Sequence, residues 1–223
     1  QLSLCVYTPS NYIYESKRDA YEDKYGRDVR EGVFFKQADR EQGVRRLMSI
    51  NLMKRMESSV YSFNQTLARI IERINRTIEN IELFEKKKNN YELINDFSEF
   101  EDFDDDYDVS TGSKISISLK DMDYQSWKRD LRADAHILEH LYKETSSIGV
   151  EDDFKLQTLK EQIKKKIERP INYNNKKIII FTAFADTANY LYDNISKYVK
   201  DNFGLDTAVI SGSVEGKSTI AKL

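Results

Sequence analysis

Between Pro9 and Pro170 the chain contains no proline, and between Gly43 and Gly112 it contains no glycine. Within this window apolar residues recur at steps of three and four, at Val44, Met48, Leu52, Met56, Val60, Phe63, Leu67, Ile70, Ile74, Ile78 and Ile81. This spacing places them on one stripe of an α-helix. A continuous helix over residues 44–88 is roughly 67 Å long at 1.5 Å per residue. We therefore expect one arm of a hairpin or bundle, or a helix that bends.

Two further stripes predict two further helices. One consists of Trp127, Leu131, Leu138, Leu141 and Tyr142, and the other of Leu156, Leu159, Ile163 and Ile167, before Pro170 ends the helix. Helices of this length can fold back on the long arm as an antiparallel bundle. Residues 91–113 carry nine acidic residues and no basic one. This segment is a solvated linker, a docking segment for a partner, or a flap that competes with nucleic acid.

The pattern changes after residue 175. Residues 177–181 form a short apolar run typical of a strand buried on both faces of a parallel sheet. Ala188, Leu191, Ile195 and Val199 predict a helix of about 18 residues, and residues 206–211 predict a second strand. The fold class is therefore mostly α with a small α/β part, a long-helix bundle followed by one parallel β-α-β unit. Two strands are fewer than a stable α/β sheet needs, so we expect the start of a larger domain.

Composition excludes several classes. The 223 residues are 33% charged, but the net charge is only −3, so charge alone indicates no partner. Cys5 is the single cysteine, which rules out an internal disulfide and favours a reducing, cytoplasmic location. No apolar run approaches the roughly 20 residues that span a bilayer, so no membrane association is expected. The chain begins on Gln1 and stops after a predicted strand, and we expect it to be part of a longer protein.

Two short motifs suggest chemistry that their context does not favour. Residues 211–219, SGSVEGKST, approach the phosphate-binding loop G-x-x-x-x-G-K-[ST], but serine stands where the first glycine belongs. His136-Ile137-Leu138-Glu139-His140 reads H-x-x-E-H, an inverted zinc-protease motif. At 100° per residue, however, His136, Glu139 and His140 fall outside the apolar stripe of their helix. We expect neither an ATP site nor a metal site here.

Four stretches together resemble the Swi/Snf-like helicases of superfamily two. Residues 52–63, LMKRMESSVYSF, resemble the Arg-Glu-Ser-Ser helix that follows the first ATPase lobe. Residues 152–163, DDFKLQTLKEQI, resemble the helix that leads into the second lobe. Residues 176–195, KKIIIFTAFADTANYLYDNI, resemble helicase motif IV and its helix, and AVISGS (208–213) resembles the next strand. The order and spacing match, and the resemblance covers about residues 44–223.

The resemblance implies a domain plan. Residues 1–43 form an N-terminal connecting segment, residues 44–170 a helical insertion, and residues 171–223 the start of a RecA-like second lobe. In such enzymes ATP and magnesium bind between two lobes, through motifs that this chain lacks. The chain then belongs to an ATP-dependent DNA helicase or translocase, with no cofactor of its own and double-stranded DNA as its partner.

The resemblance also implies a nucleic-acid surface. Thr182 and Phe184 lie where motif IV approaches the nucleic-acid backbone, and Ser211 and Gly212 end the neighbouring strand on the same edge. The segment 44–90 has ten basic residues and five acidic ones. The basic residues include Arg45, Arg46, Lys54 and Arg55. That excess suits a phosphate-facing surface. A strand-end cap for Thr182 and a basic face that serves solubility are the simpler alternatives.

A different class of function remains open, namely a non-enzymatic helical module that binds protein partners. In either case the incomplete sheet has open edges, which invite pairing with another chain. We therefore expect the chain to self-associate through its incomplete sheet, either by strand pairing between two copies or by docking of the sheet on a neighbour's helices.

Overall fold

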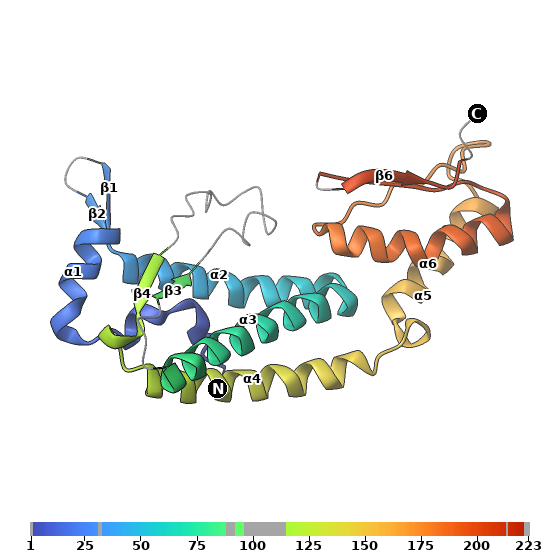
Figure 1. Ribbon diagram of the computed structural model, residues 1–223. Helices are drawn as coiled ribbons and strands as arrows, with labels where there is room; N and C mark the ends of the chain where they lie inside the picture. The colour runs from blue at the N-terminus through green and yellow to red at the C-terminus, as the bar shows by residue number, and fades with distance from the viewer. Residues whose placement is uncertain (1, 31–32, 88–91, 96–114, 213, 221–223) are drawn as a thin grey trace. The chain divides into compact units, whose positions relative to one another are not determined.

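The computed structural model describes residues 2–30, 33–87, 92–95, 115–212 and 214–220. It is mostly helical, with short antiparallel strand pairs (Figure 1). By its internal contacts the chain divides into two compact units. Unit 1 comprises residues 1–53 and 66–142, and unit 2 comprises residues 54–65 and 143–223. Each unit is described below on its own.

The N-terminal segment belongs to the core of unit 1. It contains two short 3-10 helices, η1 (Cys5–Tyr7) and η2 (Pro9–Tyr12), followed by α1 (Glu15–Tyr25). Every residue from Leu4 to Thr8 is at most 3% exposed. The carboxylate of Asp134 accepts hydrogen bonds from the backbone N–H groups of Ser3 and Cys5 at 2.7 and 2.8 Å. The segment predicted to connect is therefore packed against a helix more than 120 residues away in sequence.

The stretch predicted as one helix is two helices. They are α2 (Gln37–Ser58) and α3 (Val60–Lys87), preceded by the antiparallel pair β1 (Arg27–Arg30) and β2 (Val33–Phe35). The chain runs out along α2 and returns along α3, with Ser59 between them (Figure 1). Of the expected alternatives, the structure shows the bend, whose position at Ser59 the spacing did not indicate.

The helix α4 (Tyr124–Ser146) lies antiparallel to α3. Lys128 Nζ pairs with Glu85 at 2.7 Å, and Arg132 pairs with Glu82 at 2.9 Å. The strands β3 (Glu92–Asn95) and β4 (Ile115–Ser118) form an antiparallel pair, and η4 (Leu119–Asp121) leads into α4. The rest of the acidic segment 91–113 lies outside the described residues.

Unit 2 is built on two helices, α5 (Phe154–Glu168) and α6 (Ala185–Phe203), with η5 (Val150–Asp152) before them. Its buried core consists of Leu156, Ile163, Ile167, Ile195 and Val199. Both helices match their predicted positions. The predicted domain boundary at residue 170 differs from the contacts, because the apolar stripe of α5 packs against α6 rather than completing the bundle of unit 1.

The predicted parallel β-α-β unit does not form among the described residues. Residues 176–181 have no strand partner there, and β5 (Ala208–Ser211) pairs antiparallel with β6 (Val214–Ser218). Ile179 is 78% exposed and Phe181 is 91% exposed. A strand is held by hydrogen bonds to a neighbouring strand, and no described segment supplies that neighbour. The helix between the two predicted strands forms because its bonds are internal.

Candidate functional site

The turn between α2 and α3 is made by one buried serine. The N–H of Ser59 donates to the carbonyl of Arg55 at 2.9 Å, and its own carbonyl accepts from the N–H of Phe63 at 3.1 Å. Its hydroxyl accepts from the N–H of Ser62 at 3.0 Å. Serine suits a helix start because its side-chain oxygen replaces a missing backbone acceptor. Ser59 therefore ends one helix and begins the next without a glycine or proline.

Arg55 is buried beside this turn and is 3% exposed. Its Nη1 donates to Asp186 Oδ2 at 2.8 Å and to Ser62 Oγ at 3.0 Å. The guanidinium carbon lies 4.5 Å from the centre of the Phe184 ring. Burying a charge is costly unless it is paired and hydrogen-bonded. Arg55 meets both conditions with groups that follow it by as many as 131 positions in sequence.

Two hydroxyl groups extend this contact. Ser58 Oγ lies 2.9 Å from Thr187 Oγ1, and Ser59 Oγ lies 3.2 Å from the same oxygen. Thr187 is in the first turn of α6 and is 4% exposed. The last turn of α2 and the first turn of α6 are thus joined by an ion pair and by hydroxyl contacts. We call this cluster the tip junction: Arg55, Ser58, Ser59, Phe184, Asp186 and Thr187.

Aromatic side chains and α5 support the tip junction. The rings of Tyr61 and Tyr190 stack with centroids 5.0 Å apart and an interplanar angle of 12°. The hydroxyl of Tyr190 donates to Asp153 Oδ2 at 2.9 Å. Burial, together with that hydrogen bond, raises the pKa of Tyr190 above its ordinary value. Lys155 Nζ donates to the carbonyl of Glu57. The hydroxyl of Tyr190 therefore stays protonated at neutral pH and keeps its hydrogen bond to Asp153.

Two predicted nucleic-acid residues, Arg55 and Phe184, are brought together by the fold. Phe184 is 6% exposed, and its ring contacts the guanidinium of Arg55 inside unit 2. Because both are buried, they are not placed to touch a nucleic-acid backbone directly. The sequence reasoning did not select Asp186 and Thr187. The available signal was their position, because an acidic residue and a threonine both favour the start of a helix. That position indicates the helix start but not the partner.

The remaining strand-end candidates do not converge. Thr182 Oγ1 donates to the carbonyl of Phe184 at 2.8 Å, so its hydroxyl is used locally, but no strand ends at this residue for it to cap. Ser211 is half-buried and Gly212 is exposed in the β5–β6 turn. Among the described residues no hydrogen bond joins Thr182 to either of them.

The basic candidates on α2 lie in two different units. Arg45 is half-buried and its Nε donates to Gln42 Oε1 at 3.1 Å, whereas Arg46 is exposed. Both belong to unit 1, while the exposed Lys54 belongs to unit 2. Arg46 and Lys54 are exposed, and their role stays a prediction.

The segment that approaches a phosphate-binding loop is a β-hairpin. Val209 pairs with Lys217 and Ala208 pairs with Ser218 across β5 and β6. A phosphate-binding loop needs glycine amides wrapped around the phosphates and a helix that begins immediately after them. Strand geometry at Gly216, Lys217 and Ser218 does not fit that arrangement. The residues present therefore do not suit ATP, and the lack of ATP binding stays a prediction.

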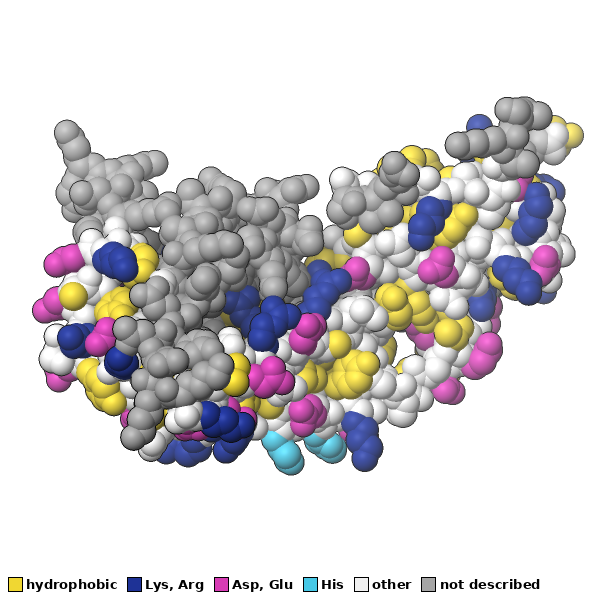
Figure 2. Space-filling model, in the orientation of Figure 1, with side chains coloured by type: hydrophobic (Ala, Val, Ile, Leu, Met, Phe, Trp, Pro, Cys, Tyr) yellow, Lys and Arg dark blue, Asp and Glu magenta, His cyan; other side chains and the backbone are white. Residues whose placement is uncertain are grey.

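The two histidines lie on the surface of α4. His136, Glu139 and His140 are all exposed, as the helical spacing predicts. Figure 2 shows the two imidazoles projecting from the surface. In the described part of the chain no group of three or more His, Cys, Asp or Glu side chains is arranged to hold a metal ion. Within those same residues, no helix combines the length and apolar character needed to cross a bilayer.

Unit 1 contains a buried carboxyl group that the sequence did not indicate. Glu41 is 1% exposed and accepts hydrogen bonds from Ser10 N at 2.9 Å, Ser10 Oγ at 2.7 Å and Gln37 Nε2 at 3.2 Å. No cationic side chain among the described residues pairs with it. Burial raises the pKa of Glu41 to about 7, against the opposing effect of these hydrogen bonds. The carboxyl ties the N-terminal segment to the first turn of α2.

Comparison with protein families, with curated proteins and with solved structures finds no match to this chain.

Proposed function

We propose that this chain is part of an ATP-driven nucleic-acid translocase of the Swi/Snf-like type. In this proposal unit 2 contains the start of the second RecA-like lobe, and the helical hairpin of α2 and α3 provides its support. The chain supplies no ATP site of its own. ATP and magnesium bind in parts of such an enzyme that the resemblance does not cover.

One observation carries the proposal: three separate stretches that resemble the family contact one another. The Arg-Glu-Ser-Ser stretch supplies Arg55 and Ser58, and the motif IV stretch supplies Asp186 and Thr187. The third stretch, residues 152–163, supplies Asp153, which accepts a hydrogen bond from the hydroxyl of Tyr190. Chance similarities at sites about 100 and 130 residues apart have no physical reason to meet. Their contact supports a shared function.

The tip junction suggests what the hairpin does in such an enzyme. Phe184 is buried, and the carbonyl of the same residue holds Thr182. The start of α6 and the residues just before it are therefore fixed to the end of α2. A translocase works by moving two lobes, and each lobe must move as one body. We infer that Arg55 positions the motif IV segment so that hairpin tip and lobe move together.

The test is ATP hydrolysis by the protein made from its complete reading frame. We expect hydrolysis that double-stranded DNA stimulates, and a loss of about tenfold in the stimulated rate for Arg55→Ala, equal to about 1.4 kcal/mol. Arg55→Lys should recover part of that rate, because it restores the charge but not the planar stack on Phe184. Lys143→Ala, an exposed change in unit 2, is the matched control. Absence of hydrolysis with any nucleic acid would favour the alternative, a non-enzymatic helical interaction module.

A further inference from the structure

The most basic stretch of the chain runs along α5 and the loop that follows it. Residues 160–177 contain seven lysines and arginines and only two glutamates. This excess lies outside the segment 44–90, where the sequence reasoning placed the nucleic-acid surface. Five of the seven are exposed and form what we call the α5–loop cations: Lys164, Lys165, Arg169, Lys176 and Lys177.

These cations are almost free of acidic partners. The one ion pair among them in the described part of the chain joins Lys164 to Glu168 at 3.9 Å. Lys165 and Arg169 are one helical turn apart and therefore neighbours on the surface, about 6 Å between Cβ atoms. Like charges at that spacing repel. A polyanion bound along this surface relieves the repulsion and releases its own counterions.

The packing of α5 fixes the direction of these side chains. Leu156, Ile163 and Ile167 are buried against α6. Lys164 and Lys165, which lie between them in the sequence, are exposed to solvent. This arrangement argues against a lipid surface as the ligand, because a helix that binds a membrane interface turns its apolar face outward.

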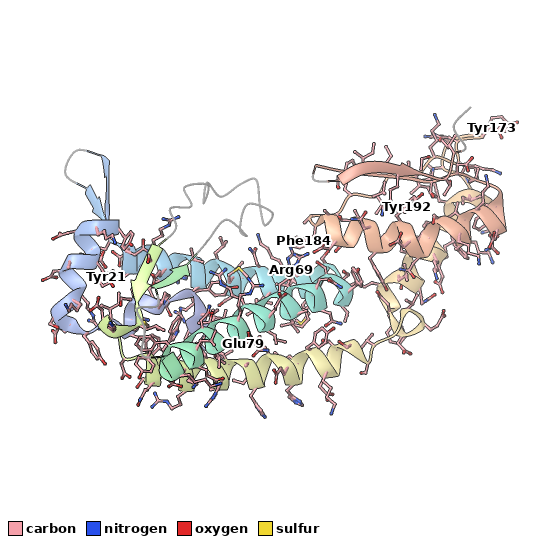
Figure 3. The ribbon with its side chains drawn as sticks, viewed as in Figure 1. Tyr21, Arg69, Glu79, Tyr173, Phe184 and Tyr192 are labelled. Carbon is pink, nitrogen blue, oxygen red and sulfur yellow. The ribbon has the colours of Figure 1, made fainter. Side chains whose placement is uncertain are left out.

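An aromatic ring stands between the two halves of the basic stretch. Tyr173 is 94% exposed and projects from the loop (Figure 3). The turn that presents it is closed by a hydrogen bond from Asn175 N to the carbonyl of Asn172 at 3.0 Å, with Asn174 at φ 56°. A ring with free faces beside several cations has the components of a single-strand site, in which bases stack on aromatics and cations follow the phosphates.

We propose that α5 and the loop after it bind single-stranded nucleic acid, with Tyr173 stacking on a base and the α5–loop cations contacting phosphates. This inference rests on the proposed nucleic-acid function and adds a surface and a strand preference to it. Double-stranded nucleic acid offers the same phosphates but no unstacked base. The stacking part therefore distinguishes the two forms.

The experiment is fluorescence anisotropy of a labelled 12-nucleotide single strand with the full chain, at several salt concentrations. We expect Lys165→Gln, Arg169→Gln, Lys176→Gln and Lys177→Gln together to reduce the slope of log affinity against log salt by about 3. Affinity at 0.1 M salt should fall at least about thirtyfold. The matched control replaces four exposed lysines elsewhere with glutamine: Lys17, Lys86, Lys143 and Lys197. It removes the same charge and should change affinity less than about threefold.

The second variant isolates the ring. Tyr173→Ser should weaken single-strand binding about five- to hundredfold without changing the salt slope, and should leave duplex binding unchanged. Tyr14→Ser, exposed in unit 1, is its control. Equal losses in both charge variants, tighter binding to duplex, or binding to anionic vesicles but not to nucleic acid would each overturn the inference. If the complete protein still hydrolyses ATP in response to DNA, such a result overturns this surface and leaves the proposed function standing.

Discussion

Two regions, the tip junction and the apolar run at residues 177–181, reverse the usual distribution of polar and apolar residues. Arg55 is 3% exposed and Thr187 is 4% exposed, whereas Ile179 is 78% and Phe181 is 91% exposed. The polar residues are buried because each has a partner within unit 2. The apolar run is exposed because no described strand pairs with it. In these two regions burial follows the availability of partners rather than hydropathy.

The largest effect should come from removing the buried cation. Arg55→Ala leaves Asp186 without its ion pair and Phe184 without its stacking partner, and should destabilise the start of α6 by about 3 kcal/mol. Amide hydrogen exchange of residues 184–190 should accelerate about a hundredfold. Arg46→Ala, an exposed change on the same helix, should leave that exchange unaltered. Equal exchange rates in Arg55→Ala and in the unsubstituted protein would show that the buried charge does not hold α6.

The next largest effect should come from Glu41, a buried carboxyl group that pairs with no cationic side chain among the described residues. The pKa of Glu41 is about 7 in the folded chain against an ordinary 4.5, so the folded state binds more protons between these values. Stability is therefore full below pH 4.5 and is lost as pH rises through 7, by about 3 kcal/mol at most. Urea unfolding at pH 5 and pH 8, followed by Trp127 fluorescence, measures this in unit 1. Glu41→Gln should flatten the dependence, and exposed Glu139→Gln should not.

A smaller effect is expected from the hydroxyl contacts. Thr187→Val keeps the shape of the side chain but leaves the hydroxyls of Ser58 and Ser59 without this partner, which should cost about 1–2 kcal/mol. Exchange of the α6 amides should accelerate about tenfold. Thr158→Val, exposed on α5, serves as the control. A neutral result for Thr187→Val would assign the strength of the tip junction to the Arg55 ion pair alone.

The apolar run should affect association and not stability. Ile179→Ser with Phe181→Ser changes only exposed side chains, so unfolding should shift by less than about 0.5 kcal/mol. We expect the unsubstituted chain to associate at micromolar concentration through strand pairing and the double variant to be a monomer. Light scattering measures both, with exposed Ile171→Ser as control. A monomer of 26.2 kDa for the unsubstituted chain would contradict self-association.

Periodicity predicted the helices well because helix bonds are local. It placed α4, α5 and α6 correctly, but it missed the turn at Ser59, because the apolar stripe continues through the turn with no glycine or proline. It also placed Met56 in the core, whereas the structure exposes Met56 by 48% and buries Arg55. Because the chain changes direction at Ser59, a different side of the last turn of α2 faces the interior. No spacing rule within one helix reports that rotation.

The candidate site followed the same division. The sequence selected Arg55 and Phe184, and the structure places them together, but buried rather than on a nucleic-acid surface. It did not select Asp186, because an aspartate occurs both in the first turn of exposed helices and in buried ion pairs. The residue type alone does not distinguish the two roles. The sequence reasoning did not select the α5–loop cations, and only the structure shows that, among the described residues, one ion pair involves them.

The sequence by itself determined where α4, α5 and α6 form, because side-chain spacing and internal hydrogen bonds are properties of a single segment. It also predicted a strand over residues 177–181, which has no strand partner among the described residues. Only the tertiary structure decided that the N-terminal segment is core, that α5 packs with α6, and that a buried arginine joins α2 to α6. Each of these depends on which groups lie opposite each other in the folded chain, in two of the three cases across more than 100 residues of sequence. Partners of that kind are chosen by three-dimensional packing and not by any local pattern.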